Sequence, residues 1–272
     1  MEKYRKRVAD KLLKEQLESA GVVLIQGAKW CGKTTTAENM AASVLYMDNP
    51  STIRSNLMLA ENDPEFLLQG ETPRLIDEWA EAPVLWDAVR YAVDMRGDVG
   101  QFILTGSAVP KDVTDDENLK EEEKRMHSGV GRIAPMRMRT MSLWESKESN
   151  GKVSLASLFE GDADVAAISD LTIEGLAYAT CRGGWPASTK LKEKAALRVA
   201  RNYVEEVINY DVHRVDGVDK NTTRVRKLLE SYARNISTMA ANETIMADVR
   251  ATDQTISPNT FAIYLSALRR IF

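Results

Sequence analysis

The feature that most constrains the fold is the segment Gly27-Ala-Lys-Trp-Cys-Gly-Lys-Thr34, which matches the phosphate-loop pattern GxxxxGK[ST] at every fixed position. An apolar run, 21–26, precedes it, and a helix-forming stretch, 35–43, follows it. Strand, loop and helix in this order are what a phosphate site requires, because loop N–H groups and the start of the helix converge on one anion. The alternative is a glycine-rich turn without a ligand.

Each fixed residue of this loop has a chemical role. The glycines let the backbone wrap the phosphates, Lys33 carries a positive charge to the β and γ phosphates, and the Thr34 hydroxyl binds Mg²⁺. We therefore expect ATP and Mg²⁺ as ligands. We expect Cys31 to fill space rather than to act in redox chemistry. The predicted nucleotide-binding residues are Gly27, Ala28, Lys29, Trp30, Cys31, Gly32, Lys33, Thr34 and Thr35.

Two carboxylates close a later apolar run. Leu75-Ile76 leads directly into Asp77-Glu78, which predicts an acidic pair at the carboxyl end of a parallel strand beside the loop. In such sites the first acid holds Mg²⁺ and its water shell, and the second polarises the attacking water as general base. The pair favours hydrolysis over transfer to a substrate hydroxyl. The alternative is a solvated acidic strand end.

Three further positions are candidates for contact with the γ-phosphate. Thr105 and Ser107 follow the apolar run Phe102-Ile-Leu104, so their hydroxyls are expected at the same sheet edge, either as sensors or as an ordinary strand-to-loop turn. Arg132 follows two glycines, and a positioned arginine can stabilise phosphoryl charge in cis or across subunits. The alternative for Arg132 is a surface residue paired with an acidic loop, and His127 is expected to be structural.

Apolar runs alternate with helical patterns, which predicts an α/β fold with a largely parallel sheet flanked by helices. The predicted strands are 21–26, 44–47, 74–76, 101–104 and 137–143. The predicted helices are 4–18, 35–43, 51–69, 83–91, 172–180, 190–210, 222–235, 242–250 and 258–272. Residues 111–124 are almost all charged or polar and are expected to form a mobile surface loop.

The motifs together resemble a known family. The loop, Arg74–Trp79, Phe102–Ala108, Gly129–Arg132, Met141–Glu145 and Gly183-Gly-Trp-Pro186 are similar to prokaryotic AAA-type P-loop ATPases with a C-terminal domain of unknown function (the domain of unknown function 4143 group). The resemblance implies an AAA-like core, 1–155, a helical lid, 156–220, and a winged-helix-like segment, 221–272. It also places Thr105 where better-known AAA proteins carry an asparagine sensor. Members of this family are usually longer, so a truncated form is expected.

Composition excludes several classes of protein. The net charge is −4, with 44% hydrophobic and 28% charged residues, which is typical of a soluble globular protein and gives no chain-wide cationic field. Cys31 and Cys181 have no disulfide or zinc pattern. No run reaches the roughly 18 apolar residues of a membrane span. We expect a cytoplasmic protein with no membrane contact.

The C-terminal helices leave the choice of partner open. Residues 221–272 carry seven Lys/Arg and four Asp/Glu, and their three-helix order is compatible with a helix-turn-helix that binds duplex DNA. A plain packing module is the alternative. The leading prediction is an AAA-type ATPase that acts as a conformational switch or motor, and that can form a homo-oligomer. The alternatives are a nucleotide-regulated DNA-binding protein with negligible turnover and a small-molecule kinase.

Overall fold

The computed structural model describes residues 4–106, 131–161, 166–215 and 217–271. Contacts group these residues into two compact units, one formed by residues 4–106 and 131–200 and the other by residues 201–271. The change of unit falls inside a helix, at Arg201. The division into three parts at residues 155 and 220 stays a prediction.

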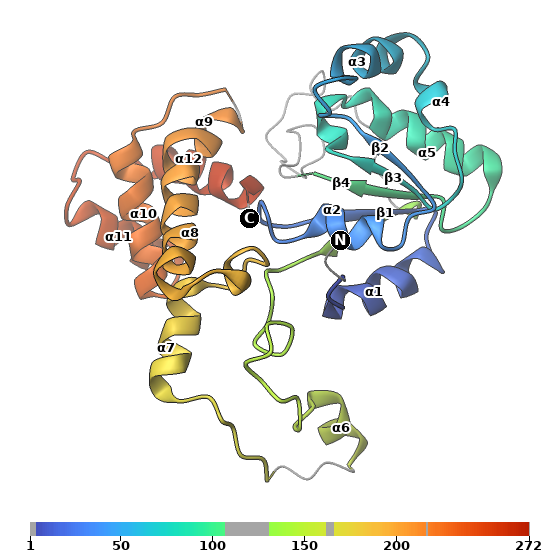
Figure 1. Cartoon of the computed structure of the whole chain (residues 1–272). Helices are drawn as coiled ribbons and strands as arrows, with labels where there is room; N and C mark the ends of the chain where they lie inside the picture. Colours follow the sequence, from blue (N-terminus) through green and yellow to red (C-terminus); the bar gives the residue numbers. More distant parts are fainter. Residues whose placement is uncertain (1–3, 107–130, 162–165, 216, 272) are drawn as a thin grey trace. The chain divides into compact units, whose positions relative to one another are not determined.

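The first unit is built on a sheet of five parallel strands in the order β2-β3-β4-β1-β5 (Figure 1). The strands are β1 (Val22–Gln26), β2 (Ser43–Tyr46), β3 (Arg74–Asp77), β4 (Phe102–Thr105) and β5 (Ile133–Arg137). β1 lies between β4 and β5 and is hydrogen-bonded on both sides. The parallel sheet confirms the predicted α/β class.

The last strand lies earlier in the sequence than predicted. The alternating pattern predicts a strand over 137–143, whereas β5 ends at Arg137. The Met138 N–H still donates to the Gln26 carbonyl at 2.7 Å, but the Met141 N–H donates to the Gly184 carbonyl, also at 2.7 Å. The prediction was wrong because this segment leaves the sheet and pairs with a later turn.

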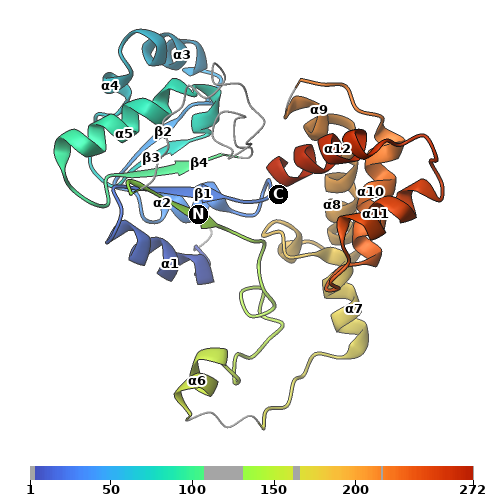
Figure 2. The same ribbon diagram turned by 180° about the vertical axis from the view of Figure 1, so that it is seen from behind.

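Side chains that alternate along the strands fill one core on each face of the sheet. Val22 and Leu24 belong to one core, and Val23 and Ile25 to the other. The first core is completed by α3 (Ile53–Asn62), α4 (Pro64–Leu67) and α5 (Val84–Arg96), and the second by α1 (Val8–Leu17) and α2 (Lys33–Glu38) (Figures 1 and 2). Burial on both faces explains why the interior strands β1, β3 and β4 read as continuous apolar runs.

Local signals divide or shorten two of the predicted helices. The stretch 51–69 forms two helices, because the Asp63 side chain accepts the Phe66 N–H to cap α4 and Pro64 occupies its first turn. The stretch 35–43 is helical only as far as Glu38, since the chain turns there to enter β2.

All secondary-structure elements that the structure describes after β5 are helical. They are α6 (Leu155–Glu160), α7 (Ile173–Arg182), η4 (Ser188–Lys190), α8 (Glu193–Glu206), a π-helical turn (Val207–Asp211), α9 (Val212–Arg214), α10 (Thr222–Arg234), α11 (Asn242–Arg250) and α12 (Pro258–Ile271). All five helices predicted beyond residue 170 are confirmed, and α6 is an addition. Between residues 217 and 271 the described elements are α10, α11 and α12, so the wing of the winged-helix expectation is not seen in this part.

The second unit has a core of its own. The Tyr264 hydroxyl accepts the Asn221 N–H at 2.7 Å and so joins α12 to the start of α10. Its buried apolar residues, all at most 8% exposed, include Val207, Val225, Leu228, Ile245, Val249, Phe261, Leu265 and Leu268.

Several expectations concern residues that the structure does not describe. The predicted loop 111–124, Ser107 and His127 all lie outside the described residues. Among the helices of the described chain, none is both long enough and apolar enough to cross a bilayer.

Candidate functional site

The phosphate-loop segment begins directly after β1 and runs into α2. Gly27 has to be glycine, because a Cβ there would lie 2.0 Å from the Met138 carbonyl oxygen. Gly32 has a φ of 104° and Trp30 a φ of 61°, so a bulky residue is held in the left-handed region. The Cys31 side chain is fully buried, with Sγ 3.7 Å from the Met138 carbonyl oxygen. The loop therefore has one side in the protein core.

Lys33 folds back over the loop that precedes it. Its Nζ donates to the carbonyl oxygens of Gly27 at 2.8 Å and Ala28 at 3.2 Å, and the residue is buried. Burial lowers the pKa of Lys33, against the nearby charges of Asp77 and Glu78. An ammonium group held by carbonyls alone can exchange them for phosphate oxygens, which are stronger acceptors.

Two hydroxyls from different elements converge on one carboxylate oxygen. Thr34 Oγ1, in α2, donates to Asp77 Oδ1 at 2.8 Å, and Thr105 Oγ1, at the end of β4, donates to the same oxygen. The neighbouring strands β3 and β4 bring Asp77 opposite Thr105. Burial raises the pKa of Asp77, although both hydroxyl bonds lower it. The structure thus assembles Thr34, Asp77 and Thr105, while Thr35 is exposed on α2.

Glu78 follows Asp77 in an unusual backbone conformation. Its φ of 51° and ψ of 45° lie in the left-handed region, which costs a non-glycine residue about 1–2 kcal/mol. The next residue, Trp79, is 1% exposed and packs against Trp86 with ring centroids 5.2 Å apart. Strained residues of this kind are common at functional sites.

The donor set at Thr34 and Asp77 fits Mg²⁺. A hydroxyl and a carboxylate are hard oxygen ligands, and Mg²⁺ usually takes one or two protein oxygens and completes its shell with water and phosphate oxygens. Groups of three or more His, Cys, Asp or Glu that could hold a metal do not occur among the described residues. The residues present therefore fit an ion that is bound together with a phosphate ligand.

Arg132 lies at the amino-terminal ends of the strands, whereas the phosphate loop lies at their carboxyl ends. Its carbonyl accepts the Val22 N–H at the start of β1, and its Nε donates to Asp94 Oδ1 in α5 at 2.5 Å. At about 3.3 Å per residue, the length of β1 separates it from the phosphate loop by roughly 13 Å. The structure does not bring Arg132 to the loop of its own chain, and a contact across subunits stays a prediction.

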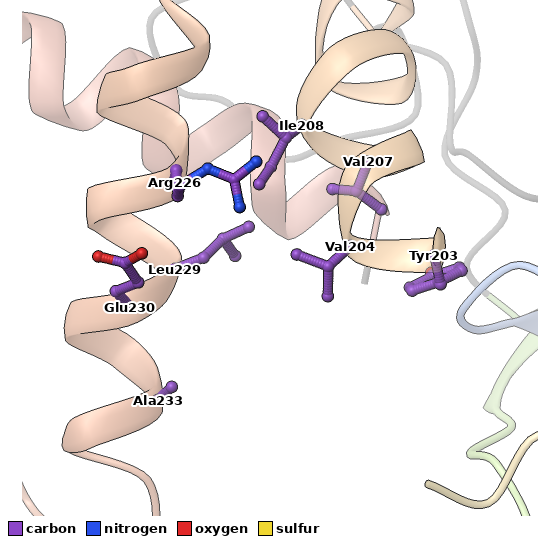
Figure 3. Close-up of a pocket in the computed structure, with 8 residues that line it drawn as sticks. All are labelled: Tyr203, Val204, Val207, Ile208, Arg226, Leu229, Glu230 and Ala233. Carbon is purple, nitrogen blue, oxygen red and sulfur yellow. The ribbon is translucent and has the colours of Figure 1, made fainter. Parts of the chain in front are cut away.

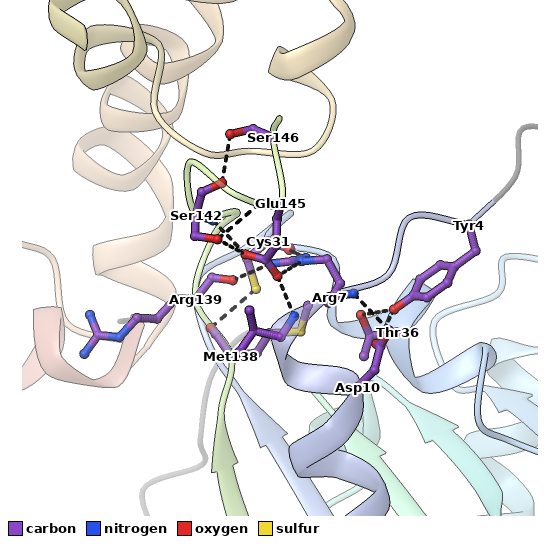
Figure 4. Close-up of polar contacts among 11 residues, drawn as sticks. Tyr4, Arg7, Asp10, Cys31, Thr36, Met138, Arg139, Ser142, Glu145 and Ser146 are labelled. Atoms are coloured by element: carbon purple, nitrogen blue, oxygen red, sulfur yellow. Dashed lines mark hydrogen bonds and ion pairs between the residues drawn. The ribbon is translucent and has the colours of Figure 1, made fainter. Parts of the chain in front are cut away.

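A buried ion pair supports the outer side of the loop and has no sequence signal of its own. Arg7 donates from Nη1 to the Cys31 carbonyl oxygen at 2.8 Å and from Nε to Glu145 Oε1 at 2.7 Å (Figure 4). Burial opposes ionisation of Glu145, but the hydrogen bonds it accepts from Ser142, Arg7 and Val8 hold its pKa below its usual value. Glu145 belongs to a stretch that the resemblance singles out, whereas Arg7 reads as an ordinary charged residue.

The Gly183-Gly-Trp-Pro186 turn also contacts the loop. Trp185 Nε1 donates to the Lys29 carbonyl oxygen at 3.2 Å. A Cβ at Gly184 would lie 2.1 Å from the Met141 carbonyl oxygen, so only glycine allows this approach. The resemblance singles out the turn, but the sequence gives it no chemistry. The structure places it against the phosphate loop.

A separate cavity of about 300 Å³ lies within the second unit, between α8 with its π-helical turn and α10 (Figure 3). Val204, Val207 and Leu229 give it apolar walls. The complete lining is Tyr203, Val204, Val207, Ile208, Arg226, Leu229, Glu230 and Ala233. This lining comes from helical segments and contains no glycine-rich loop, so it lacks the phosphate-binding feature of the first unit.

Part of the positive charge of the second unit is engaged in ion pairs. Three arginines of α10 each contact a carboxylate at 2.5–2.6 Å: Arg224 with Asp253, Arg226 with Glu205 and Arg234 with Asp248. A surface that binds duplex DNA needs cations directed at phosphates. This pairing reduces the positive charge that α10 offers to DNA phosphates.

Comparisons with known proteins agree with the P-loop reading. Residues 19–146 match a family described as an AAA domain, and residues 173–272 match a domain of unknown function (DUF8612). The expected relation to the 4143 group is not confirmed, because the C-terminal match is to DUF8612. None of the curated proteins matches the sequence significantly.

Among solved structures, the Walker-type ATPase PABY2304 of Pyrococcus abyssi is 14% identical with a TM-score of 0.55, and the match covers 98% of this chain and 90% of that chain. The AMPPCP-bound DnaA of Aquifex aeolicus is 15% identical with a TM-score of 0.36, over 99% of this chain and 88% of that chain, and is too distant to support an argument. At this identity the similarity to PABY2304 shows the fold, which is that of a P-loop NTPase.

Proposed function

We propose that this protein binds ATP with Mg²⁺, hydrolyses it, and uses the reaction as a conformational switch or motor on a partner in the cytoplasm. The observation that carries the proposal is the convergence of Thr34 and Thr105 on Asp77, with Lys33 beside them and Glu78 following in a strained conformation. The match of residues 19–146 to AAA domains supports it.

Each side chain has a task in this reaction. Lys33 leaves the carbonyl oxygens of Gly27 and Ala28 and pairs with the β and γ phosphates, which restores a favourable partner for its buried charge. Thr34 and Asp77 would hold Mg²⁺, which neutralises phosphate charge when bound. Thr105 keeps Asp77 oriented. Glu78 takes a proton from the attacking water as general base.

Contacts of the loop with the segment before the second unit support a switch. Trp185 binds the Lys29 carbonyl, and its turn lies only a few residues before α8, the helix in which the second unit begins. A change in the loop on phosphate release would alter this hydrogen bond first. We infer that the Gly183–Pro186 turn transmits the state of the site.

The experiment is a phosphate-release assay with Glu78→Gln. Removal of a general base is expected to lower kcat by about 10²–10⁴ while ATP still binds. Glu81→Gln is the matched control, because Glu81 is exposed and makes the same charge change three residues later. Wild-type protein that binds ATP but releases no phosphate, with or without duplex DNA, would rule out the proposed activity.

The same assay separates the other candidate functions. A nucleotide-regulated DNA-binding protein would bind duplex DNA in an ATP-dependent manner with negligible turnover. The paired arginines of α10 make this the weaker candidate. A small-molecule kinase would transfer phosphate to an acceptor and would leave Glu78 without a role.

A further inference from the structure

Two side chains that are not part of the phosphate loop donate hydrogen bonds to its backbone carbonyls, on either side of the strained residue Trp30. Arg7 Nη1 donates to the Cys31 carbonyl oxygen at 2.8 Å, and Trp185 Nε1 donates to the Lys29 carbonyl oxygen at 3.2 Å. Trp30 stands between them with a φ of 61°. A bulky residue stays in the left-handed region only where its surroundings fix it. These two donors supply that restraint.

The guanidinium of Arg7 is itself fixed in place. Besides the Cys31 carbonyl, it donates to Glu145 Oε1 at 2.7 Å and to the Arg139 carbonyl oxygen at 2.9 Å (Figure 4). The two side chains of the ion pair are 4% and 5% exposed. Glu145 is held in turn by the N–H groups of Val8 and Ser142, at 2.8 and 2.7 Å. Hydrogen bonds to three oxygens fix the planar guanidinium in one orientation. The ammonium group of a lysine cannot make the same set of hydrogen bonds.

The geometry of a peptide unit links this anchor to the ligand. The Cys31 carbonyl and the Gly32 N–H belong to one planar trans peptide and point in opposite directions. A donor that holds the carbonyl on the outer side therefore turns the Gly32 N–H toward the inner side, where such loops take phosphate oxygens.

We propose that Arg7, fixed by Glu145, is a positioning residue for nucleotide binding, because it orients the Cys31–Gly32 peptide toward a phosphate oxygen. The inference rests on the proposed function for the identity of the ligand, ATP. It does not depend on hydrolysis. Since Glu145 neutralises the guanidinium charge, Arg7 acts through the direction of the Gly32 N–H rather than by attracting the phosphates.

The test compares Arg7→Gln and Arg7→Lys with a matched control, Arg74→Gln. Arg74 Nε also holds a backbone carbonyl, that of Leu67 at 2.9 Å, but it lies at the start of β3, away from the loop. We expect Arg7→Gln to weaken binding of a fluorescent non-hydrolysable ATP analogue with Mg²⁺ roughly tenfold and to raise KM similarly, with kcat changed less than about threefold. Arg7→Lys should recover part of the affinity. Arg74→Gln should lower thermal stability without changing the affinity.

A second measurement needs no nucleotide. In protein labelled with ¹⁵N-glycine, Arg7→Gln should shift the Gly32 amide resonance, and Arg74→Gln should leave it unchanged. If Arg7→Gln does not fold, Arg7→Lys is judged by the same two measurements. Wild-type analogue affinity together with an unshifted Gly32 resonance would overturn the proposal. If the wild type releases no phosphate but analogue binding still depends on Arg7, hydrolysis fails and the positioning role stands.

Discussion

Asp77→Asn should stabilise the nucleotide-free protein while it removes Mg²⁺-dependent hydrolysis. Asp77 is 6% exposed, and its Oδ1 accepts the hydroxyls of Thr34 and Thr105. An asparagine of the same size keeps both bonds and has no charge for burial to disfavour. Burial raises the pKa of Asp77 above its usual 3.8. The folded state therefore holds this proton more tightly than the unfolded state does.

The sign of the effect follows from this difference in proton binding. Stability from the protonated carboxyl is complete below the unfolded pKa and is lost as pH rises through the raised folded pKa. At neutral pH the buried carboxylate is thus a net destabilising group. Removing it should stabilise the protein by about 1 kcal/mol, the usual scale for relief at a functional site. For a chain of this size that raises Tm by about 2–4 °C.

Thermal denaturation followed by circular dichroism, with EDTA present, measures this difference. The gap between the melting temperatures of Asp77→Asn and wild type should be largest at neutral pH and should narrow as the pH is lowered, because the wild-type carboxyl takes up a proton at a higher pH than an ordinary aspartate does. Asp98→Asn, at an exposed position, is the control for a change in net charge. If Asp77→Asn melts at or below the wild-type temperature at about pH 7, the carboxylate is not destabilising and the reasoning is refuted.

Other substitutions probe the rest of the site. If Arg132 acts across subunits, Arg132→Ala should lower kcat by about 10³-fold or more. Mixing this variant with Lys33→Ala protein, which keeps Arg132, should then restore phosphate release. No recovery on mixing would count against this role. Gly184→Ala places a Cβ 2.1 Å from the Met141 carbonyl oxygen. We therefore expect the free energy of unfolding, measured by urea denaturation, to fall by about 1–3 kcal/mol, and ATP binding, measured by calorimetry, to weaken. Unchanged ATP affinity would show that the turn does not influence the loop. Burial raises the pKa of Glu145, but the hydrogen bonds that its carboxylate accepts lower this pKa by more, so the pKa lies below its usual value. The stabilisation from the Glu145 carboxylate is therefore present above its usual pKa of 4.5 and is lost as pH falls through the lower pKa of the folded state. Glu145→Gln should make the free energy of unfolding fall less steeply at acid pH. An unchanged dependence on pH would contradict this.

Local sequence signals were enough to predict the interior strands of the sheet and the polar residues at their carboxyl ends, but not the last strand, β5. The interior strands β1, β3 and β4 are buried on both faces, so each reads as an apolar run. Two of these runs end at a polar residue, Asp77 or Thr105. Parallel strands share one edge, which makes the meeting of these residues predictable from their order alone. The helix ends were harder to predict, because Asp63 and Pro64 interrupt a continuous pattern.

Contacts between distant segments could not be predicted. Arg7 and Glu145 are 138 residues apart, and neither residue type nor spacing identifies one as the partner of the other. Arg132 shows the same limit from the other direction. The glycines before it are compatible with a ligand contact, yet its place before β5 puts it at the far edge of the sheet.

The burial of Cys31 makes the motion of the phosphate loop measurable by chemical labelling. Its side chain lies in the same core as Leu13 and Ile103, and burial raises the pKa of its thiol, so a reagent can reach it only when the loop opens. Cys181 is exposed and reacts without such opening. Modification should therefore proceed in two phases, the slower of which reports the rate of loop opening. The degree to which ATP slows that phase would measure how firmly the nucleotide closes the loop.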